Sequence, residues 1–520
     1  MQNKTALAAL GILALLTGGA LLALLVAALR SPVSIGAAYD AYFLTIAGFT
    51  LWQAALSTLL SLLPAVFIAR ALHRHPAFFG RALIIRLMAL PLALPALIAA
   101  LGLLALLGRA GIAAPFLTWI TGARWPGIYG LSGILIAHVF FNMPLAVRLF
   151  LAALEAVPQD HWRLGAQLGF KPSVQFQLLE WPAIKSTLPG VALMVFLLCA
   201  TSFTLVLTLG GGPQATTLEV AIYQALRFDY APERAVAFAL AQLIFALALA
   251  FGLSRFVLPG VSRHADVKAT RLNAPKPFET VLNIGSIVMA VIFIAAPMLA
   301  ILARGIDADL MTLLTQKTVI AATLTSLVLA AMASLTACFI AAALLSAKIP
   351  AIARFASQGG GVLLSISPVV IGAGWFIALQ GLINPLKAAP VLIIAVNALM
   401  ALPFVLRALS PSWTASRAHH DRLAVSLGLT GIKRFYLVEF IALRSQLLAA
   451  FAFAAALSLG DLGVVALFGS ESLQTLPSLL FSRLGSYRSD DAAGLALFLM
   501  LLCLGLLWLA DHLAAKESRI

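Results

Sequence analysis

Long apolar segments alternate with short polar segments along the whole chain. Twelve of the apolar segments are long enough to cross a membrane as helices, and a polar segment at 255–280 separates six from six. Only helices and closed barrels satisfy every backbone polar group inside a bilayer, and apolar runs of this length exclude the barrel. The predicted spans are 6–29, 46–69, 87–108, 128–150, 187–209, 234–254, 281–303, 318–346, 359–380, 389–409, 446–468 and 492–513.

A charged segment of the first half recurs in the second half at an offset of 259 positions. Between Pro144 and Glu180, 11 of 37 positions are identical to their counterparts, where chance would give about three. An even number of spans separates the two copies, so the halves run in the same direction and can form a pathway between them. The predicted fold is all-α and polytopic, with two tandem six-helix halves at 1–258 and 279–520 and a linker at 259–278.

The distribution of Lys and Arg predicts the orientation of the chain. With the N-terminus in the cytoplasm, 24 of the 34 basic residues fall in cytoplasmic segments, as the positive-inside rule requires. Both termini and both copies of the repeat are therefore expected in the cytoplasm. The apolar run after Lys4 is too long for a signal peptide, so we expect an uncleaved first helix.

Composition agrees with the membrane assignment. Hydrophobic residues make up 62% of the chain and charged residues 10%, where a soluble domain has about 25% charged residues. The net charge of +15 comes from basic residues between spans, which favours topology over nucleic-acid binding. Three cysteines, Cys199, Cys338 and Cys503, stand singly in apolar runs, so they predict no metal site and no disulfide.

The repeated segment predicts a short amphipathic helix outside the bilayer in each half. Leu164 and Leu168, like Leu423 and Leu427, are four positions apart and share a helical face. A glycine follows each pair, where a helix would end. The leucines either rest on the membrane and the neighbouring spans, or they fill a groove on a partner protein.

These segments resemble the EAA loop of importer permeases of the ATP-binding-cassette class. Gly169 is followed after ten positions by Leu-Glu-Trp-Pro, and Gly428 by Val-Glu-Phe-Ile. Arg163 and Arg422 stand where the family often has an acidic residue, so the resemblance implies the glycine and the hydrophobic face but not the family's charge contact. The implied coupling residues are Arg163, Leu164, Leu168, Gly169, Phe170, Arg422, Leu423, Leu427, Gly428 and Leu429.

Further stretches are similar to the bacterial thiamine permeases of this class. They are FTLWQAALSTLLSLLPAVFIARAL (49–72), LGGGPQATTLEVAIYQAL (209–226) and SLGDLGVVALFGSESLQTLPSLLFSRLGSYRS (458–489). HVFFNMPLAVR (138–148) is shared with ferric-iron permeases. The resemblance implies permease domains at about 46–256 and 316–512 with coupling loops at about 156–184 and 411–443. It also implies thiamine and its phosphate esters as cargo, a periplasmic thiamine-binding protein, and the bacterial inner membrane as the location.

No segment of the chain has the G-x-x-x-x-G-K-[ST] pattern of a nucleotide-binding loop. The resemblance therefore implies a separate pair of ATPase subunits that use the ATP, with no cofactor bound by this chain. No carboxylate pair, nucleophilic triad or metal cluster predicts an enzyme. Ferric iron as the cargo and a secondary transporter remain the alternatives; a secondary transporter predicts more charged residues deep in the spans.

Four polar residues are candidates for the solute pathway. Asp461 lies in an apolar run, where an ionisable residue is a functional candidate that could attract a cationic thiazolium, or is paired within the bundle or at the water boundary. Ser202, Thr204 and Ser458 are small hydroxyls at a similar depth, and close helix packing is the alternative role. For His138 and Asn142, hydrogen bonds between helices are favoured over ligand contact. Further predictions concern Pro144 and Pro403, expected to bend their spans, and Glu180 and Glu439, expected to pair with nearby arginines.

Overall fold

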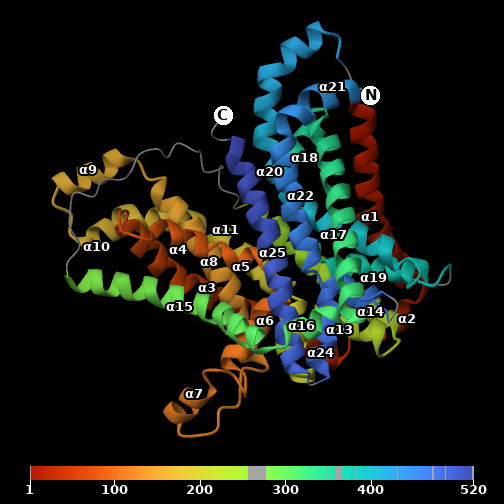
Figure 1. Ribbon diagram of the computed structural model, residues 1–520, viewed down its shortest axis with the longest axis horizontal. Helices are drawn as coiled ribbons and strands as arrows, with labels where there is room; N and C mark the ends of the chain where they lie inside the picture. Colours follow the sequence, from red (N-terminus) through yellow and green to blue (C-terminus); the bar gives the residue numbers. More distant parts are fainter. Residues whose placement is uncertain are drawn as a thin grey trace.

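Every regular element that the structure describes is a helix, as the sequence predicts. The computed structural model describes residues 2–255, 277–347, 349–357, 366–380, 382–429, 431–470, 473–486 and 488–517. Most of the predicted linker at 259–278 lies outside the described residues. In Figure 1, most helices of the first half run across the left of the view, together with the first helix of the second half. Most helices of the second half stand upright on the right, beside the first helix of the chain.

In the described residues, the first half has five helices of 20 or more residues and a set of shorter ones. Its elements are α1 (Gln2–Arg30), α2 (Pro32–Ala37), α3 (Ala41–Arg74), α4 (Arg81–Leu87), α5 (Leu90–Ala93), α6 (Ala96–Leu107), α7 (Ala114–Thr121), α8 (Leu131–Glu155), α9 (Gln159–Gln167), α10 (Pro172–Gln175), the π-helix η1 (Phe176–Glu180), α11 (Trp181–Ala200), α12 (Thr204–Leu209), the 3₁₀ turn η2 (Pro213–Ala215), α13 (Leu218–Arg227) and α14 (Pro232–Arg255). Helix α7 projects from the lower edge of Figure 1.

The second half repeats this order with fewer breaks. Its elements are α15 (Pro277–Asp307), α16 (Leu310–Thr315), α17 (Lys317–Leu345), α18 (Pro350–Ser357), α19 (Pro368–Leu379), α20 (Ala389–Ser426), α21 (Gly431–Arg434), the π-helix η4 (Phe435–Glu439), α22 (Phe440–Leu459), α23 (Gly463–Phe468), α24 (Leu476–Gly485) and α25 (Ser489–Glu517). A shift of 259 positions relates η1 to η4, α11 to α22 and α12 to α23, and a shift of 258 relates α13 to α24.

Ten of the described helices are long and apolar enough to cross a membrane, or up to eleven if one bent pair counts as a span. The bent pair, Arg81–Leu92 with Ala96–Leu107, corresponds to the predicted span 87–108 and turns by 108°. The predicted span 359–380 lies partly outside the described residues, and its described part is the 12-residue helix α19. The protein is a multi-pass helical membrane protein; the total of twelve spans and the orientation stay predictions.

Two predicted spans prove to be a helix followed by a break. The segments 187–209 and 446–468 each end their long helix early, at Ala200 and Leu459, and continue as the six-residue helices α12 and α23. At Gly460, a Cβ atom would lie 2.4 Å from a side-chain carbon of Pro95 in the other half. The second break therefore lies where the two halves touch, a contact that local hydrophobicity cannot reveal.

The first helix of each half packs on the other half. Helix α1 lies against α17 and α19, and α15 lies against α3 and α6. Both contacts use a glycine: a Cβ on Gly374 would lie 2.4 Å from the Ala20 carbonyl oxygen, and one on Gly102 would lie 2.6 Å from the Pro297 carbonyl oxygen. The indole Nε1 of Trp375 also donates to the Leu16 carbonyl oxygen at 2.9 Å. Small residues let helix backbones approach this closely, so the halves are interlocked.

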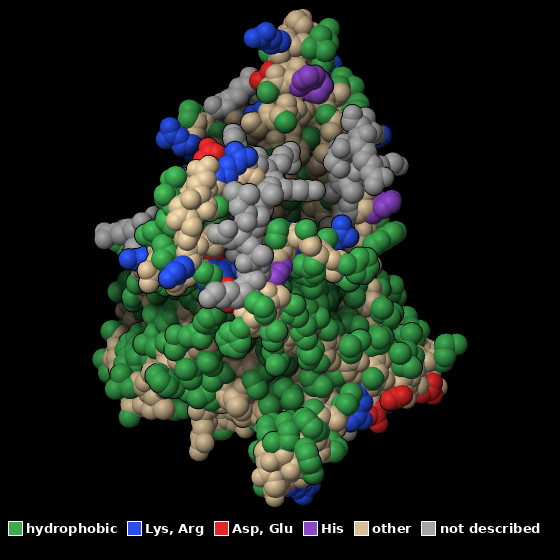
Figure 2. All heavy atoms as spheres, turned by 90° about the vertical axis from the view of Figure 1, so that its left-hand side faces the viewer, with side chains coloured by type: hydrophobic (Ala, Val, Ile, Leu, Met, Phe, Trp, Pro, Cys, Tyr) green, Lys and Arg blue, Asp and Glu red, His purple; other side chains and the backbone are tan. Residues whose placement is uncertain are grey.

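The surface is divided into a polar end and an apolar body. In Figure 2, most of the visible Lys, Arg and His side chains lie in the upper part, while hydrophobic side chains cover much of the lower part, with a few charged groups below. The long helices have many exposed apolar residues, such as Leu63, Met289 and Phe339. Such a surface is incompatible with water over this area and is suited to lipid.

Candidate functional site

The first copy of the repeated segment forms the amphipathic helix predicted from its spacing. Helix α9 ends at Gln167, and Gly169 has the left-handed φ of +65° that lets the chain turn away. The Phe170 N–H donates to the Gly165 carbonyl oxygen at 2.9 Å, the long-range bond of a Schellman cap. Trp162 is buried against the His73 ring, 5.0 Å between centroids, so α9 is anchored through one face.

The second copy has the same cap at the end of a different helix. Gly428 has φ +64°, and the Leu429 N–H donates to the Ala424 carbonyl oxygen at 2.9 Å. The sequence predicted a separate short helix before this cap, and this prediction is wrong for the second half. The segment is the end of the 38-residue helix α20. The first copy is interrupted at Pro158, which disfavours helix in the preceding residue. Its counterpart is Arg417, which lets the helix continue.

The leucines of both copies point away from the protein. Leu164 and Leu168 are 54% and 62% exposed, and Leu423 and Leu427 are 60% and 63% exposed. The arginines that precede them, Arg163 and Arg422, are also exposed, and Phe170 and Leu429 are half-buried behind the caps. The described residues thus leave two matching apolar faces uncovered.

A buried cluster of charges holds the first copy to the bundle. Glu180, at the end of η1, is fully buried and accepts from Arg74 at 2.8 and 3.1 Å and from Arg70. Arg74 also pairs with Glu279 of α15 at 3.2 Å. Removing one partner from a buried ion pair is strongly destabilising. The cluster therefore ties the first copy of the repeated segment to α3 and, through Glu279, to the second half.

The second half uses a local version of this cluster. Glu439, at the end of η4, accepts from Arg434 at 2.8 Å, and Arg434 also pairs with Asp421. Arg417 instead donates to the Ser346 carbonyl oxygen at 2.7 Å. The predicted pairing of Glu180 and Glu439 with arginines is confirmed. The two π-turns precede equivalent helices, and such turns are frequent at functional sites.

Two of the predicted pathway residues occupy equivalent places after the long helices. Ser202 follows α11 as Asp461 follows α22, and both are partly buried. The Oδ1 atom of Asp461 accepts from the Gly463 N–H at 3.1 Å, while Oδ2 has no hydrogen-bond partner among the described residues. A Cβ on Gly463 would lie within 4 Å of Asp461, Phe203 and Val369, so this point joins the two halves.

Three of the remaining polar candidates, Ser458, His138 and Asn142, have side-chain partners within the bundle. Asn397 of α20 donates to the Ser458 hydroxyl at 2.9 Å, and Thr204 begins α12. His138 Nδ1 lies 2.9 Å from the Ser57 hydroxyl of α3, and Asn142 donates to the Cys199 sulfur at 3.3 Å. The expected hydrogen bonds between helices are thus present for His138 and Asn142. Pro144 and Pro403 both lie inside helices that continue past them.

The structure also reveals a buried polar group that the sequence analysis did not identify. Gln53, Glu219 and Gln242 are fully buried, and each has one oxygen without a hydrogen-bond partner among the described residues. A comparison of the two halves could have found them, because polar residues in the first half align with residues that are not polar in the second. At an offset of 258, the counterparts of Glu219 and Gln242 are Pro477 and Met500.

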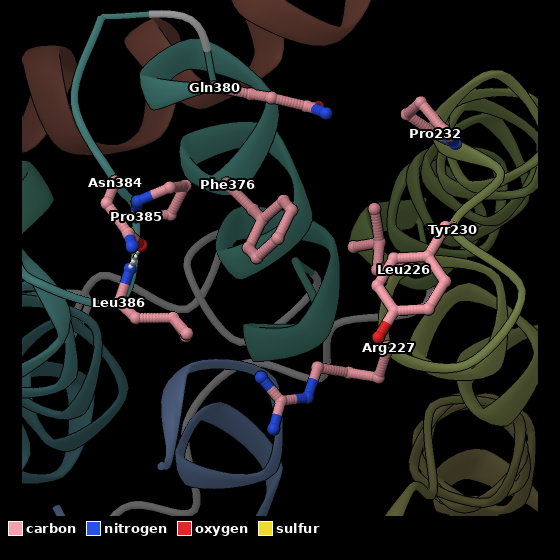
Figure 3. Close-up of a pocket in the computed structure, with 9 residues that line it drawn as sticks. All are labelled: Leu226, Arg227, Tyr230, Pro232, Phe376, Gln380, Asn384, Pro385 and Leu386. Carbon is pink, nitrogen blue, oxygen red and sulfur yellow. Dashed lines mark hydrogen bonds between the residues drawn. The ribbon is translucent and has the colours of Figure 1, made fainter. Parts of the chain in front are cut away.

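A pocket opens between the halves at the far ends of α13 and α19. Figure 3 shows Arg227 and Tyr230 on one side and Phe376 and Asn384 on the other. The Arg227 guanidinium donates to the Gly469 carbonyl oxygen at 3.0 Å and so bridges the two halves. Among the described residues, no group of three or more His, Cys, Asp or Glu side chains could hold a metal ion.

These features define the class of the protein. It is a multi-pass helical membrane protein of two related, interlocked halves, each with an exposed apolar cap segment at the end of a helix. No protein-family profile matches the chain, but individual relatives do.

The thiamine transport system permease protein of Brucella abortus (strain 2308) is 48% identical over 515 residues, which cover 98% of this chain and 95% of that protein. The protein of the same description from Escherichia coli (strain K12) is 40% identical over 496 residues, 92% of this chain and 91% of that protein. The ferric transport system permease protein of Actinobacillus pleuropneumoniae is 28% identical over only 179 residues, 34% of this chain and 25% of that protein. The chain belongs to the family of thiamine transport system permease proteins.

Proposed function

We propose that the chain is the membrane-spanning permease subunit of an ATP-binding-cassette importer that carries thiamine and its phosphate esters across the bacterial inner membrane. Near-full-length similarity to thiamine transport system permease proteins carries this proposal. Similarity to a ferric permease covers only a third of the chain, so ferric iron is the weaker candidate for the cargo.

The proposed topology has twelve spans with both termini in the cytoplasm. The excess of Lys and Arg in the segments that this topology places inside supports it. The two permease halves at 1–258 and 279–520 and their coupling loops agree with the recurrence of helices at offsets of 259 and 258. In Figure 1, α9 and the end of α20 lie toward the upper part, and α13 and α24 lie at the lower end.

The two exposed cap segments are the proposed docking sites for a pair of ATPase subunits. Leu164 and Leu168 on one half, and Leu423 and Leu427 on the other, present the same apolar spacing beside a glycine turn. Two equivalent faces on one chain suit a partner with two equivalent grooves. Nucleotide-driven approach of the ATPases would then move the halves relative to each other. The chain itself performs no catalysis in this scheme and binds no cofactor.

The proposed solute path runs between the halves, past Asp461. Its carboxylate has one oxygen without a partner among the described residues, at the point where Phe203 and Val369 meet. A carboxylate here would attract the positive charge of a thiazolium ring. Ser202, Thr204 and Ser458 are proposed to border the same path, with Ser458 held by Asn397. A periplasmic thiamine-binding protein would deliver the solute.

Reconstituted uptake tests the function. The chain is placed in proteoliposomes with the candidate ATPase and the candidate thiamine-binding protein, and labelled thiamine and ferric iron are offered separately and in competition. We expect ATP-dependent uptake of thiamine that requires the binding protein and is unaffected by iron. Uptake of iron in preference to thiamine would reject the cargo, and uptake without the ATPase that follows an ion gradient would reject the class of transporter.

A further inference from the structure

The buried polar group around Glu219 exists in one half only, although the two halves share a fold. Helices α13 and α24 begin with the same contact: the Leu218 N–H donates to the Thr50 hydroxyl at 3.0 Å, and the Leu476 N–H donates to the Ser326 hydroxyl at 2.7 Å. Because Thr50 and Ser326 are equivalent, Leu329, three residues after Ser326, holds the position in the second half that Gln53 holds in the first. The second half thus builds the same arrangement with Leu329, Pro477 and Met500. Buried polar groups are costly, and the fold does not require these.

Two members of the group bind the end of one helix within the first half. The Gln53 side-chain amide donates to the Cys199 carbonyl oxygen at 3.0 Å, and the Gln242 amide donates to the Ala200 carbonyl oxygen at 3.3 Å. These bonds add side-chain donors to two carbonyl groups at the end of α11, where a helix runs out of backbone donors. They account for the two glutamines but not for the carboxyl group beside them.

Glu219 makes its contact across the two halves. The Ser367 hydroxyl donates to Glu219 Oε2 at 2.6 Å and itself accepts from the Val369 N–H at 3.1 Å, as the N-cap of α19. Glu219 is fully buried and Ser367 is 4% exposed. A buried hydrogen bond between two rigid helices, one from each half, is broken whenever these helices separate.

The same face of α13 carries two further contacts, one within the first half and one to the second half. Tyr223, one turn after Glu219, packs edge-on against Phe203 with 5.4 Å between the ring centroids. Arg227, one turn further, reaches the Gly469 carbonyl oxygen at 3.0 Å and lines the pocket of Figure 3. Spacing of four residues places all three on one helical face. Helix α13 lies toward the lower end of Figure 1, away from α9 and the end of α20.

The carboxyl group is suited to a hydrogen bond without charge. Helix α13 is not among the candidate spans, and burial raises the pKa of Glu219 to about 8, against the opposing effects of hydrogen bonding by Ser367 and Gln242. At neutral pH the group is therefore mostly protonated. A glutamine at this position would keep the size, the neutrality and the acceptor oxygen.

We propose that the hydrogen bond between Glu219 and Ser367 is a latch that holds the outer end of the solute path closed in the conformation described here. Glu219 is a positioning residue for transport: it fixes α13 to α19 until the halves part to admit solute. The proposal rests on the proposed importer function for its role in transport, but the latch itself can be measured without transport.

Loss of the latch shifts the balance toward separated halves. One net hydrogen bond changes an equilibrium by roughly threefold to tenfold. Transport cycles should then begin without solute delivery. In the complex with the ATPase, we expect the ATP hydrolysis rate measured without binding protein to rise by about the same factor.

The test is a double-mutant cycle of Glu219→Met, Ser367→Ala and the pair, in the complete complex in lipid nanodiscs. Glu219→Met removes the cross-half bond and leaves the N-cap of α19 intact, whereas Ser367→Ala removes both. Glu219→Gln keeps the acceptor. Ser326→Ala is the matched control, because it removes an equally buried hydroxyl bond within one half. Amide hydrogen exchange of α13 and α19 is measured first, and ATP hydrolysis without binding protein second.

For Glu219→Met and Ser367→Ala, we expect faster amide exchange at α13 and α19 and faster ATP hydrolysis without binding protein. The double variant should show no larger effect than Ser367→Ala alone. Glu219→Gln and Ser326→Ala should behave nearly as the wild type. Wild-type exchange at both helices in Glu219→Met would overturn the latch. Equal effects of Ser326→Ala and Glu219→Met on α13 and α19 would overturn it as well. If the wild-type complex lacked thiamine uptake, the proposed function would fail while the exchange data still decided the latch.

Discussion

Replacement of Leu168 and Leu427 by Asp tests the docking role of the two cap segments. Both side chains are more than three-fifths exposed in the chain alone, at 62% and 63%, so each still has most of its area to bury against a partner. Complete burial of a leucine contributes about 1.5–3 kcal/mol. Each substitution should therefore weaken docking by about 1–2 kcal/mol, and the two together by about 2–4 kcal/mol, which corresponds to roughly 30- to 1,000-fold in the dissociation constant.

The stability of the permease itself should hardly change, because surface substitutions away from special contacts usually alter it by less than about 0.5 kcal/mol. The assay is binding of the ATPase to detergent-solubilised permease, with ATP-driven uptake as a second readout. Leu382→Asp is the matched control, since this leucine is 78% exposed but lies in the loop between α19 and α20, away from both caps. Wild-type affinity for the ATPase in the Leu168→Asp and Leu427→Asp double variant would refute the docking role.

Three further predictions concern other parts of the molecule. Glu180→Gln should lower the free energy of unfolding by about 3–5 kcal/mol, because it leaves Arg70 and Arg74 without their buried partner. The control is Glu155→Gln, in a more exposed pair with Arg81, which should lower the free energy of unfolding by less than about 1 kcal/mol. Equal shifts of the two variants in thermal unfolding would contradict this prediction. Gly102→Ala and Gly374→Ala should each destabilise the fold by about 1–3 kcal/mol, since the new methyl group meets a backbone oxygen of the other half. The control is Gly285→Ala, whose new methyl group meets nothing within 4 Å. This variant should be neutral or stabilising in the same unfolding assay. Asp461→Asn should raise the KM for thiamine uptake by about 10- to 100-fold, as expected for loss of a charge-assisted contact, with no change in ATPase binding; an unchanged KM would remove Asp461 from the solute path.

The apolar runs predicted the long helices well because a bilayer accepts little else. Between α1 and α25, ten of the predicted spans overlap a described helix that is long and apolar enough to cross a membrane. The repeat also predicted the caps: spacing of four places the leucines on one face, and only glycine readily adopts the left-handed turn that ends each segment. Local sequence determined these features because each depends on residues within one or two helical turns.

Tertiary structure decided what depends on residues far apart in the chain. The pairing of Glu180 with Arg70 and Arg74 was expected in kind, but the link to Glu279 joins residues on opposite halves. The breaks after α11 and α22, the exchange of α1 and α15 between the halves, and the bond from Ser367 to Glu219 leave no mark in local hydrophobicity. Whether a buried polar side chain is stabilised depends on the partner that packing brings to it, and 148 positions separate that partner from Glu219.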